Sequence, residues 1–393
     1  METEVNQMKV GIIGGGQLGK MMVLEGKKFG IYFVVLDPNL DCPAASIVDE
    51  LVVGDFYDPL KIKELAEKCH VVTYEFEHIN AEILIQLKTD GHKIYPSPET
   101  LKKIQDKAIQ KEFLRKHGIA VANFTKVKAD SVEDLSEVIE SYEYPLLLKS
   151  CRGGYDGKGN YLIKSRDDID TAYTTLGKGV WDLMIEEFVP FTKEISVVVA
   201  RGHRGEMKVY PLCENIHEDN ILRTTIFPAR VDSSIEEKAQ RLALKTMEVL
   251  EGIGVFCIEM FVTRDGEVLV NEIAPRTHNS GHYTIEGCTV SQFAQHIRAI
   301  LELPLGDVKL VNPGVMINLL GEAGYKGKAK LVGGREALEL PQVFIHYYGK
   351  TNTAPQRKMG HITVLGDCLE EALVKAEGAK KVVKVIGEEV IYE

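Results

Sequence analysis

The sequence is poor in cysteine, and the cysteines it has are scattered. Seven occur in 393 residues, and no two of them form a C-x-x-C pair. They are Cys42, Cys69, Cys151, Cys213, Cys257, Cys288 and Cys368. An odd, dispersed set argues against a disulfide framework and against a cysteine zinc site. We therefore expect reduced thiols in a cytoplasmic protein.

Long apolar runs and an excess of positive charge are also missing. No apolar run approaches the length of a membrane span, and the polar stretch METEVNQMK is unlike a signal peptide. Lysine and arginine number 47 against 58 aspartates and glutamates, a net charge of -11. This balance argues against nucleic-acid and anionic-membrane partners. An anionic ligand would need a local cluster of cations and backbone amides.

The first hundred residues alternate short apolar runs with helical stretches. The runs KVGIIG, YFVVLD, VVTYEF and KIYPS are separated in this way, which predicts a parallel, doubly wound sheet. Later segments mix β-rich runs with fewer helices. Helical patterns are expected from residue 17 and over 59–68, 81–88, 235–251, 290–303 and 369–377. Internal repeats and low-complexity linkers are absent, so we expect closely packed domains with ligands between them.

A glycine-rich turn, GIIGGGQLGKMM, follows the first apolar run. Gly14, Gly16 and Gly19 match G-x-G-x-x-G, and Asp37 ends the next apolar run. This is a nearly complete dinucleotide fingerprint. Taken alone it predicts an NAD-dependent dehydrogenase.

A second glycine-rich stretch, LLLKSCRGGYDGKGNYLIK, lies between two β-rich runs. A hairpin turn explains Asp156-Gly157, but not four glycines in seven residues after Lys149. Because glycine has no side chain, the backbone N–H groups of a glycine-rich loop can approach a polyphosphate closely, and a lysine can reach a neighbouring phosphate oxygen. We favour this phosphate loop over the simple hairpin. It is not a Walker A loop, because Gly159 stands where serine or threonine is needed.

A β-ribbon, CIEMFVTRDGEVLVNEIAPR, carries two glutamates. If Asp265-Gly266 is a two-residue turn, Arg264 pairs with Glu267 and Glu259 faces Glu272. Facing like charges destabilise a sheet unless something neutralises them, and Mg²⁺ suits paired carboxylates. The alternative is a solvated sheet face.

The same register bears on that alternative. It places Phe261, Val268 and Val270 on the face of the two glutamates, which argues against a fully solvated face. Asn271 points away from Glu272 in a regular strand, so the strand must bend or bulge if both reach one site.

Three further loops carry candidate ligands. In EEFVPFTKE, Pro190 separates two strands, and an exposed Glu186 or Glu194 can accept ribose hydroxyls; a structural connection is the alternative. The loop APRTHNSGHYTIEGC holds Arg276, which suits a small oxyanion, with four more polar residues close behind: His278, Asn279, Ser280 and His282. Three cations in HYYGKTNTAPQRKMGH predict a sugar-phosphate anchor rather than a solvated loop: Lys350, Arg357 and Lys358.

Together these segments resemble a known family. The stretches GIIGGGQLGKMM, TYEFEHI, CRGGYDGKG, NEIAPRTHNSGHYTIEGC, INLLGE and RKMGHITVLG look like the motif series of the N5-carboxyaminoimidazole ribonucleotide synthetases, in the ATP-grasp superfamily. The resemblance implies an α/β and α+β multidomain fold. Its expected parts are a Rossmann-like N-terminal domain (1–105), two ATP-grasp subdomains (106–190, with the glycine-rich lid, and 191–305, with the Mg²⁺ site) and a small mixed C-terminal domain (306–393).

The resemblance also assigns residues. Those implied to contact ATP are Lys107, Lys149, Gly153, Gly154, Tyr155, Asp156, Gly157, Lys158, Gly159, Glu186, Glu187, Phe188, Val189, Glu194, His217, Asn271 and Glu272. Mg²⁺ would be held by Glu259 and Glu272. Bicarbonate and the amine would face Tyr155, Asp156, Lys158, Arg276, His278 and Asn279. The ribonucleotide would meet Gly16, Gln17, Leu18, Glu75 and Tyr155, with its phosphate on Lys350, Arg357 and Lys358.

The implied reaction is the ATP- and bicarbonate-dependent carboxylation of 5-aminoimidazole ribonucleotide, a step of purine biosynthesis, by a cytoplasmic homodimer. Asp156, at the tip of the lid, would steer the amine proton. Three alternatives stay open: a dehydrogenase, a formate-using glycinamide ribonucleotide transformylase of the same superfamily, and a non-catalytic nucleotide-binding module.

Overall fold

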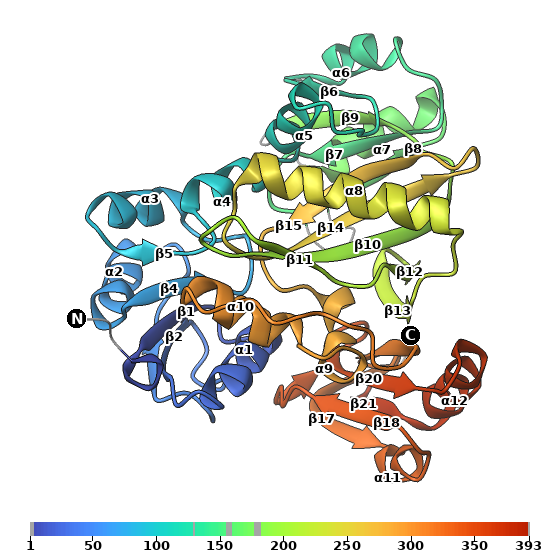
Figure 1. Ribbon diagram of the computed structural model, residues 1–393. Coiled ribbons are helices and arrows are strands. Elements are labelled where there is room, and N and C mark those ends of the chain that lie inside the picture. The colour runs from blue at the N-terminus through green and yellow to red at the C-terminus, as the bar shows by residue number, and fades with distance from the viewer. Residues whose placement is uncertain (1–3, 129, 155–158, 177–181, 392–393) are drawn as a thin grey trace.

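The computed structural model describes residues 4–128, 130–154, 159–176 and 182–391. Its N-terminal part is a five-stranded parallel sheet in the order β3-β2-β1-β4-β5 (Figure 1). The strands are β1 (Lys9–Ile13), β2 (Tyr32–Asp37), β3 (Glu50–Val53), β4 (Val71–Tyr74) and β5 (Lys93–Ile94). The sequence predicts the parallel, doubly wound sheet from four of these strands, which are short apolar runs separated by helices. Strand β3 is not expected from the sequence, and it follows β2 without a helix between them.

Helices cover both faces of this sheet. Helices α2 (Pro59–Lys68) and α3 (Ala81–Thr89) pack on one face. Helix α1 (Gln17–Lys27) packs on the other, together with α10 (Gln292–Ile300) from far along the chain. The apolar side chains of α10 lie in the same core cluster as those of β1. The N-terminal sheet is therefore closed by a helix that a later part of the chain supplies.

The next layer is a four-stranded antiparallel sheet in the order β6-β9-β7-β8. Its strands are β6 (Phe124–Val127), β7 (Leu146–Ser150), β8 (Asn160–Ile163) and β9 (Leu183–Glu187). Helices α6 (Val132–Ile139) and α7 (Ile169–Thr175) share its core, while α4 (Pro98–Ile104) and α5 (Lys107–Lys116) lead into it from the N-terminal sheet. Strands β7 and β8 flank the glycine-rich loop, as the sequence predicts.

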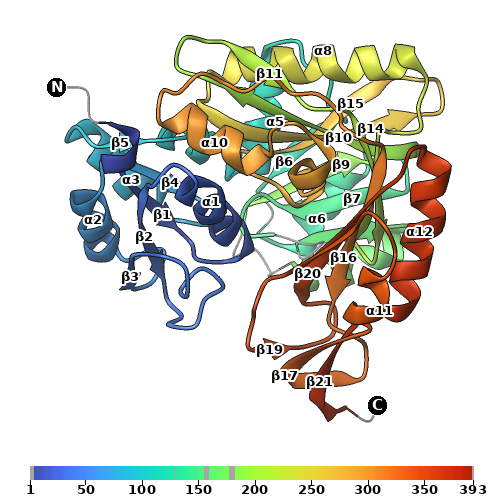
Figure 2. The same cartoon turned by 60° about the horizontal axis from the view of Figure 1, so that its bottom comes forward.

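A nine-stranded antiparallel sheet forms the centre, in the order β15-β14-β10-β12-β13-β16-β20-β18, with β11 also on β10 (Figure 2). Its strands are β10 (Phe191–Arg201), β11 (Met207–Val209), β12 (Cys213–Glu218), β13 (Ile221–Phe227), β14 (Gly254–Thr263), β15 (Val268–Ala274), β16 (Gly314–Leu320), β18 (Val343–Tyr347) and β20 (Lys358–Leu365). Helices α8 (Ser233–Leu250) and α12 (Leu369–Val382) cover its two ends. Strands from both sides of residues 305 and 306 belong to this one sheet.

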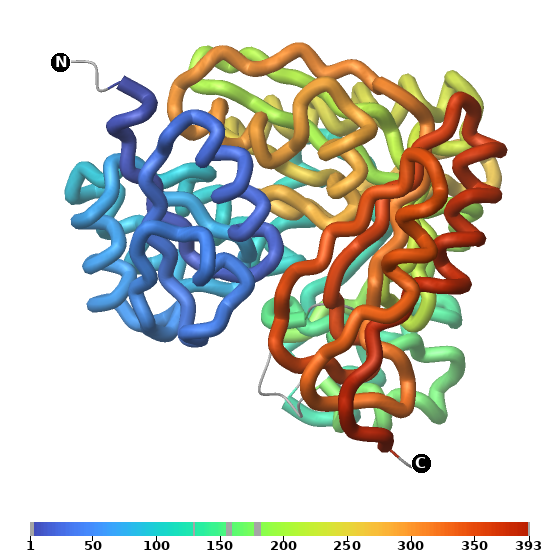
Figure 3. Tube along the Cα trace, turned by 90° about the horizontal axis from the view of Figure 1, so that it is seen from below, coloured from blue at the N-terminus to red at the C-terminus, as the bar shows by residue number. Residues whose placement is uncertain are grey.

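A small three-stranded sheet, β19-β17-β21, completes the C-terminal part, which is the orange-to-red end of the tube in Figure 3. It consists of β17 (Tyr325–Val332), β19 (Asn352–Thr353) and β21 (Lys384–Val390), with α11 (Gly334–Leu338) beside it. Between β15 and α10 the chain forms a short 3-10 helix, η3 (Asn279–Gly281), and α9 (Thr284–Gly287). None of the helices in the described ranges is long and apolar enough to cross a lipid bilayer. All seven cysteines are unpaired.

Candidate active site

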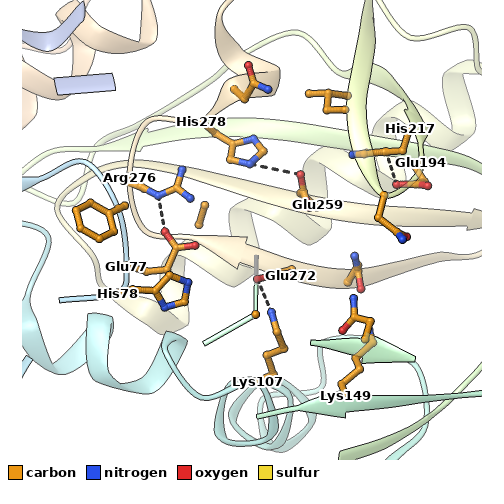
Figure 4. A pocket seen from close by; sticks show the side chains of 18 of the residues that line it. Glu77, His78, Lys107, Lys149, Glu194, His217, Glu259, Glu272, Arg276 and His278 are labelled. Atoms are coloured by element: carbon orange, nitrogen blue, oxygen red, sulfur yellow. Dashed lines mark hydrogen bonds and ion pairs between the residues drawn. The ribbon is translucent and has the colours of Figure 1, made fainter. Parts of the chain in front are cut away.

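A cavity of about 930 Å³ lies where these sheets meet (Figure 4). Its walls come from the N-terminal sheet, α5, the four-stranded sheet and the nine-stranded sheet. Residues that the sequence predicts and that line it are Gln17, Leu18, Glu75, Lys107, Lys149, Gly154, Phe188, Glu194, His217, Glu259, Asn271, Glu272, Arg276, His278, Asn279 and Lys358. The fold therefore gathers the separate sequence motifs into one site.

The first glycine-rich turn is occupied by the chain's own carboxylates. Gly16 and Gly19 donate their backbone N–H groups to the two oxygens of Glu75, at 2.6 and 2.7 Å, and Gly15 donates to Asp37 at 2.9 Å. A Cβ on Gly16 would lie 2.4 Å from Glu75 Oε1, so glycine permits this close approach. A dinucleotide pyrophosphate would need the same N–H donors. The arrangement argues against the dehydrogenase.

Glu259 and Glu272 lie directly opposite each other on β14 and β15, as predicted. The predicted two-residue turn between these strands is wrong. Thr263, not Arg264, pairs with Glu267, and the loop has three residues because Gly266 adopts a φ of +77°. The pairing shifts by one residue between Glu259 and Met260, which leaves Asn271 as the extra residue of a β-bulge. The turn is one residue longer than predicted and the bulge adds one residue to β15. These two shifts in register cancel, so Glu259 and Glu272 still face each other.

The bulge also corrects which side chains share the glutamates' face. Phe261 lines the cavity with Glu259, as predicted. Val268 and Val270 do not share that face, because the shifted register turns them into the core beneath α8. Asn271 lines the cavity beside Glu272, which fulfils the expectation that the strand bends there.

The electrostatics of this wall fit a cation. Burial, together with the carboxylates of Glu272 and Glu194, raises the pKa of Glu259 to about 7. Lys107 Nζ lies 2.8 Å from Glu272 Oε1, and His278 Nε2 lies 3.5 Å from Glu259 Oε1. Clusters of three or more metal-ligating side chains do not occur in the described ranges. Two facing carboxylates provide hard oxygen ligands for Mg²⁺, and phosphate oxygens of a nucleotide would complete its coordination.

Lys149 is held by a buried ion-pair network. Glu186 places Oε1 2.6 Å from Lys149 Nζ and Oε2 2.8 Å from Lys111 Nζ, and its side chain is 1% exposed. The two ammonium groups hold the pKa of Glu186 at about 2 although burial opposes them. Glu186 is therefore not exposed as expected, and of the two candidate ribose acceptors Glu194 is the one that lines the cavity. Glu186 holds a lysine in place, and Lys111 was missed because its partner lies on another element.

The remaining cavity wall combines a polar pair with flat apolar surfaces. Glu194 lies 2.8 Å from His217 Nδ1. Phe191 stacks on Phe261, with ring centroids 4.6 Å apart and planes 8° from parallel. Cavity residues that sequence reasoning missed are Phe76, Glu77, His78, Leu147, Asn160, Leu162, Phe191, Asn220, Leu222 and Ala274. The two-residue period of strands identifies Leu147 as sharing a face with Lys149.

An ion pair joins the N-terminal domain to the loop after β15. Arg276 Nε donates to Glu77 at 2.6 Å, and the pKa of Glu77 falls to about 2 because Arg276 outweighs the effect of burial. Glu77 lies two residues after Glu75 in TYEFEHI. Its carboxylate orients the guanidinium of Arg276, which lines the cavity together with His278 and Asn279.

The other predicted residues are described but do not line the cavity, or they lie outside the described ranges. Lys358 lines the cavity, whereas Lys350 donates to the Lys358 carbonyl at 2.7 Å and Arg357 to the Asn352 carbonyl at 2.6 Å. Predicted residues that are described but do not line it are Gly16, Gly153, Gly159, Glu186, Glu187, Val189, Lys350 and Arg357. Predicted residues outside the described ranges are Tyr155, Asp156, Gly157 and Lys158.

Comparison with known families accounts for most of the chain. Three family models match it: the ribonucleotide synthetase preATP-grasp domain over residues 7–105, the ATP-grasp domain over 112–293, and the phosphoribosylaminoimidazole carboxylase C-terminal domain over 314–375. N5-carboxyaminoimidazole ribonucleotide synthase of Bacillus subtilis is 42% identical over 91% of both chains. Phosphoribosylaminoimidazole carboxylase of Ogataea methanolica is 42% identical over 93% of this chain and 68% of its own length.

Solved structures agree. N5-carboxyaminoimidazole ribonucleotide synthetase from Thermotoga maritima is 48% identical, with a TM-score of 0.89 over 97% of this chain and 100% of that chain. The Aspergillus clavatus N5-carboxyaminoimidazole synthase, in complex with ADP and 5-aminoimidazole ribonucleotide, is 37% identical, with a TM-score of 0.88 over 96% and 99%. At 42% to 48% identity over more than nine-tenths of its length, this chain belongs to the N5-carboxyaminoimidazole ribonucleotide synthetase family of ATP-grasp enzymes.

Proposed function

We propose that this chain is an ADP-forming ligase that carboxylates 5-aminoimidazole ribonucleotide to N5-carboxyaminoimidazole ribonucleotide, using ATP and bicarbonate, in purine biosynthesis. One observation carries the proposal: Glu259, Glu272, Lys107 and Lys149 come from separate elements and line one cavity. Family membership at 42% to 48% identity supports it. A family member holds ADP and the ribonucleotide at once.

The nucleotide would lie between the four-stranded and nine-stranded sheets. Lys107 and Lys149 offer ammonium groups to its phosphates, and Glu194 offers a carboxylate to its ribose. Leu147 and Leu162 form a cross-strand pair on the cavity face of the four-stranded sheet, and the stacked Phe191 and Phe261 line the same cavity. Such apolar surfaces suit a purine base.

Glu259 and Glu272 would hold Mg²⁺. When bound, the ion would offset negative charge on the phosphates during phosphoryl transfer. Lys107 pairs with Glu272 and supplies positive charge at the same wall, so this lysine and the ion together would offset the charge of the phosphates.

The acceptor substrates would lie beside the nucleotide. Arg276, oriented by Glu77, would bind bicarbonate with His278 and Asn279. The ribonucleotide would meet Gln17 and Leu18 at the start of α1, with Glu75 near its ribose. Its phosphate would be bound by the C-terminal cations Lys350, Arg357 and Lys358.

The chemistry follows from these positions. A bicarbonate oxygen attacks the γ-phosphorus, the bond to the ADP oxygen breaks, and carboxyphosphate forms. The exocyclic amine of the ribonucleotide then attacks the carboxyl carbon of carboxyphosphate. Phosphate leaves with the electron pair of the broken C–O bond, and the amine loses a proton. Both reactants of the first step are anions, so the cations align and neutralise them. Because carboxyphosphate is labile, exclusion of water matters as much as charge.

A Glu272→Ala variant tests the proposal. We expect it to abolish ADP formation in the presence of bicarbonate and 5-aminoimidazole ribonucleotide, because the facing carboxylate is gone. ADP is measured by a coupled assay, and Glu267→Ala, an exposed glutamate at the end of the same ribbon, serves as the control. Near-normal turnover of Glu272→Ala would remove the metal assignment.

Two measurements separate the rival functions. A glycinamide ribonucleotide transformylase would consume ATP with formate, whereas this chain should consume it only with bicarbonate. When NADH is titrated with this protein, the fluorescence of NADH should not change, because Glu75 and Asp37 already accept hydrogen bonds from the glycine N–H groups. A non-catalytic module would release no phosphate under any of these conditions.

We further propose that this protein is a cytoplasmic homodimer. We also propose that its domains end at residues 105, 190 and 305. The unpaired thiols support a reducing compartment, and light scattering of the purified chain measures its assembly state. The family models that end at residue 105 and begin at 314 support the outer boundaries.

A further inference from the structure

A row of buried polar side chains crosses the nine-stranded sheet and ends at His278. Thr225 Oγ1 lies 3.0 Å from Asn215 Oδ1, and Asn215 Nδ2 lies 2.8 Å from Ser196 Oγ. Ser196 Oγ lies 3.0 Å from Ser280 Oγ, which lies 2.9 Å from His278 Nδ1. The row passes from β13 through β12 and β10 to η3, and so reaches the cavity from within the protein.

These groups are removed from water. Thr225, Ser196 and Ser280 are 0% exposed and Asn215 is 5% exposed. Burying hydroxyl and amide groups costs free energy unless each finds a partner, and an apolar core avoids that cost altogether. A fully connected polar row in a sheet interior therefore calls for a reason beyond packing.

The hydrogen bonds of the row have one direction. The Asn215 amide nitrogen can only donate, so Ser196 Oγ accepts from it and has its own proton free for Ser280. Ser280 Oγ then has its proton free for His278 Nδ1. The backbone N–H of Ser280 also donates to His278 Nδ1, at 3.3 Å.

Two thiols lie beside the row. Cys213 Sγ is 3.1 Å from Ser196 Oγ, and Cys257 Sγ is 3.4 Å from Ser280 Oγ. Sulfur is a weak donor and a weak acceptor, so the oxygen and nitrogen partners determine the direction. The Cys213 thiol also points at the backbone carbonyl of Ser196, at 3.4 Å.

We propose that this row fixes His278 as the neutral tautomer with its proton on Nε2, which makes Ser280 and Ser196 positioning residues. Nδ1 accepts hydrogen bonds from the backbone N–H and the hydroxyl of Ser280. Its lone pair is therefore engaged, and Nδ1 carries no proton. The ring therefore presents Nε2–H to the cavity, on the side of Glu259, 3.5 Å away. On the proposed function, His278 donates a hydrogen bond to an oxygen of bicarbonate or carboxyphosphate, and it does not take the amine proton.

The tautomer is measured first, by ¹⁵N NMR of the full chain labelled at histidine, with His278 assigned by a His278→Gln variant. Protonated and unprotonated ring nitrogens have distinct shifts. We expect an unprotonated Nδ1 and a protonated Nε2 without any substrate. A proton on Nδ1, or on both nitrogens at neutral pH, overturns the inference. Because this readout needs no turnover, it stands apart from failure of the proposed carboxylation, which an absence of ADP formation would reveal.

Ser280→Ala and Ser196→Ala then test the positioning role. We expect Ser280→Ala to lower kcat about 10- to 100-fold, as loss of an orienting partner does, with the KM for ATP changed less than about twofold. Its His278 ring should show a mixture of tautomers. Ser291→Ala, which removes a buried serine that caps α10, is the matched control and should lose stability without these effects.

The second variant keeps the test decisive. If Ser280→Ala does not fold, Ser196→Ala must still lower kcat, by less than the roughly 10- to 100-fold expected for Ser280→Ala, with the KM for ATP again unchanged. A kcat equal to that of Ser291→Ala in the variants that fold would show that the row serves packing alone, and the inference would be wrong.

Discussion

At the scale of single residues, the site is governed by competition for a few charged groups. Glu75 occupies the N–H groups that the sequence assigns to a cofactor, and Glu186 is taken up by two lysines. Neither outcome follows from residue type, because glutamate in each motif also suits a ligand. Glu259 is different. It faces another carboxylate across the ribbon and has a pKa of about 7, so its charge depends on what binds beside it.

This predicts a pH-dependent contribution of Mg²⁺ to nucleotide binding. Below pH 7 Glu259 takes up a proton, and a protonated carboxyl does not bind the cation. The gain in ADP affinity on adding Mg²⁺ should fall roughly tenfold from pH 8 to pH 6, as expected for one group with this pKa. Calorimetric titrations with Mg²⁺ and with EDTA measure it, corrected for ADP's own Mg²⁺ binding. Glu259→Gln should show little gain at any pH, and a constant gain in the unmodified chain would contradict the assignment.

At the scale of elements, where local sequence signals are strong, they predict the bounds of a helix correctly. The helix expected over 59–68 is α2, which begins at Pro59 after the Asp58 cap. The helix expected to end at residue 377 extends to Val382, because Gly378 is accommodated inside α12. The ribbon is the instructive case. Its turn was predicted with the wrong length, yet the bulge at Asn271 restores the facing glutamates.

Helix α5 carries a prediction of its own. Lys107 and Lys111 are one turn apart and reach different sheets, Lys107 to Glu272 and Lys111 to Glu186. Without the charge of Lys111, Glu186 is left to neutralise Lys149 alone. Lys111→Met should therefore weaken ATP binding roughly tenfold, or about 1.4 kcal/mol. This is less than the ~4 kcal/mol between two charges about 4 Å apart at an effective dielectric constant of about 20, because Lys111 does not itself line the cavity.

The measurement is the ATP dissociation constant of the folded variant. Lys116→Met, an exposed lysine on the same helix, is the control and should bind ATP normally. The affinity for 5-aminoimidazole ribonucleotide should not change in either variant. ATP binding by Lys111→Met that matches the control would show that Lys111 stabilises the fold and nothing more.

At the scale of the whole molecule, the cavity exists only because distant segments meet. Glu75 at the end of β4 and Lys358 at the start of β20 line the same space. Lys20 donates to the Tyr348 carbonyl at 2.9 Å, and Thr351 donates to Asp41 at 2.7 Å, so the N-terminal and C-terminal parts are in direct contact. The ribonucleotide would be held between them.

This arrangement predicts separable substrate effects. Lys350→Ala combined with Arg357→Ala should raise the KM for 5-aminoimidazole ribonucleotide roughly 100- to 10,000-fold, since two hydrogen bonds to a charged group are lost and each contributes about 1.5–3 kcal/mol. The KM for ATP should change far less. Steady-state kinetics with each substrate varied measures both, and Lys380→Ala, an exposed cation of α12, is the control. Equal effects on both substrates would show that these cations serve another purpose.

The sequence by itself determined the alternation of strands and helices in the N-terminal part, its parallel sheet, and the motifs that meet at the site. These rest on short-range signals: apolar period, glycine, proline and capping residues. Only the tertiary structure decided that Glu75 occupies the glycine turn, that Glu186 is buried between two lysines, and that Ser280 orients His278. Each depends on a partner from another strand or helix, and which donor meets which carboxylate is settled by packing rather than by local preference.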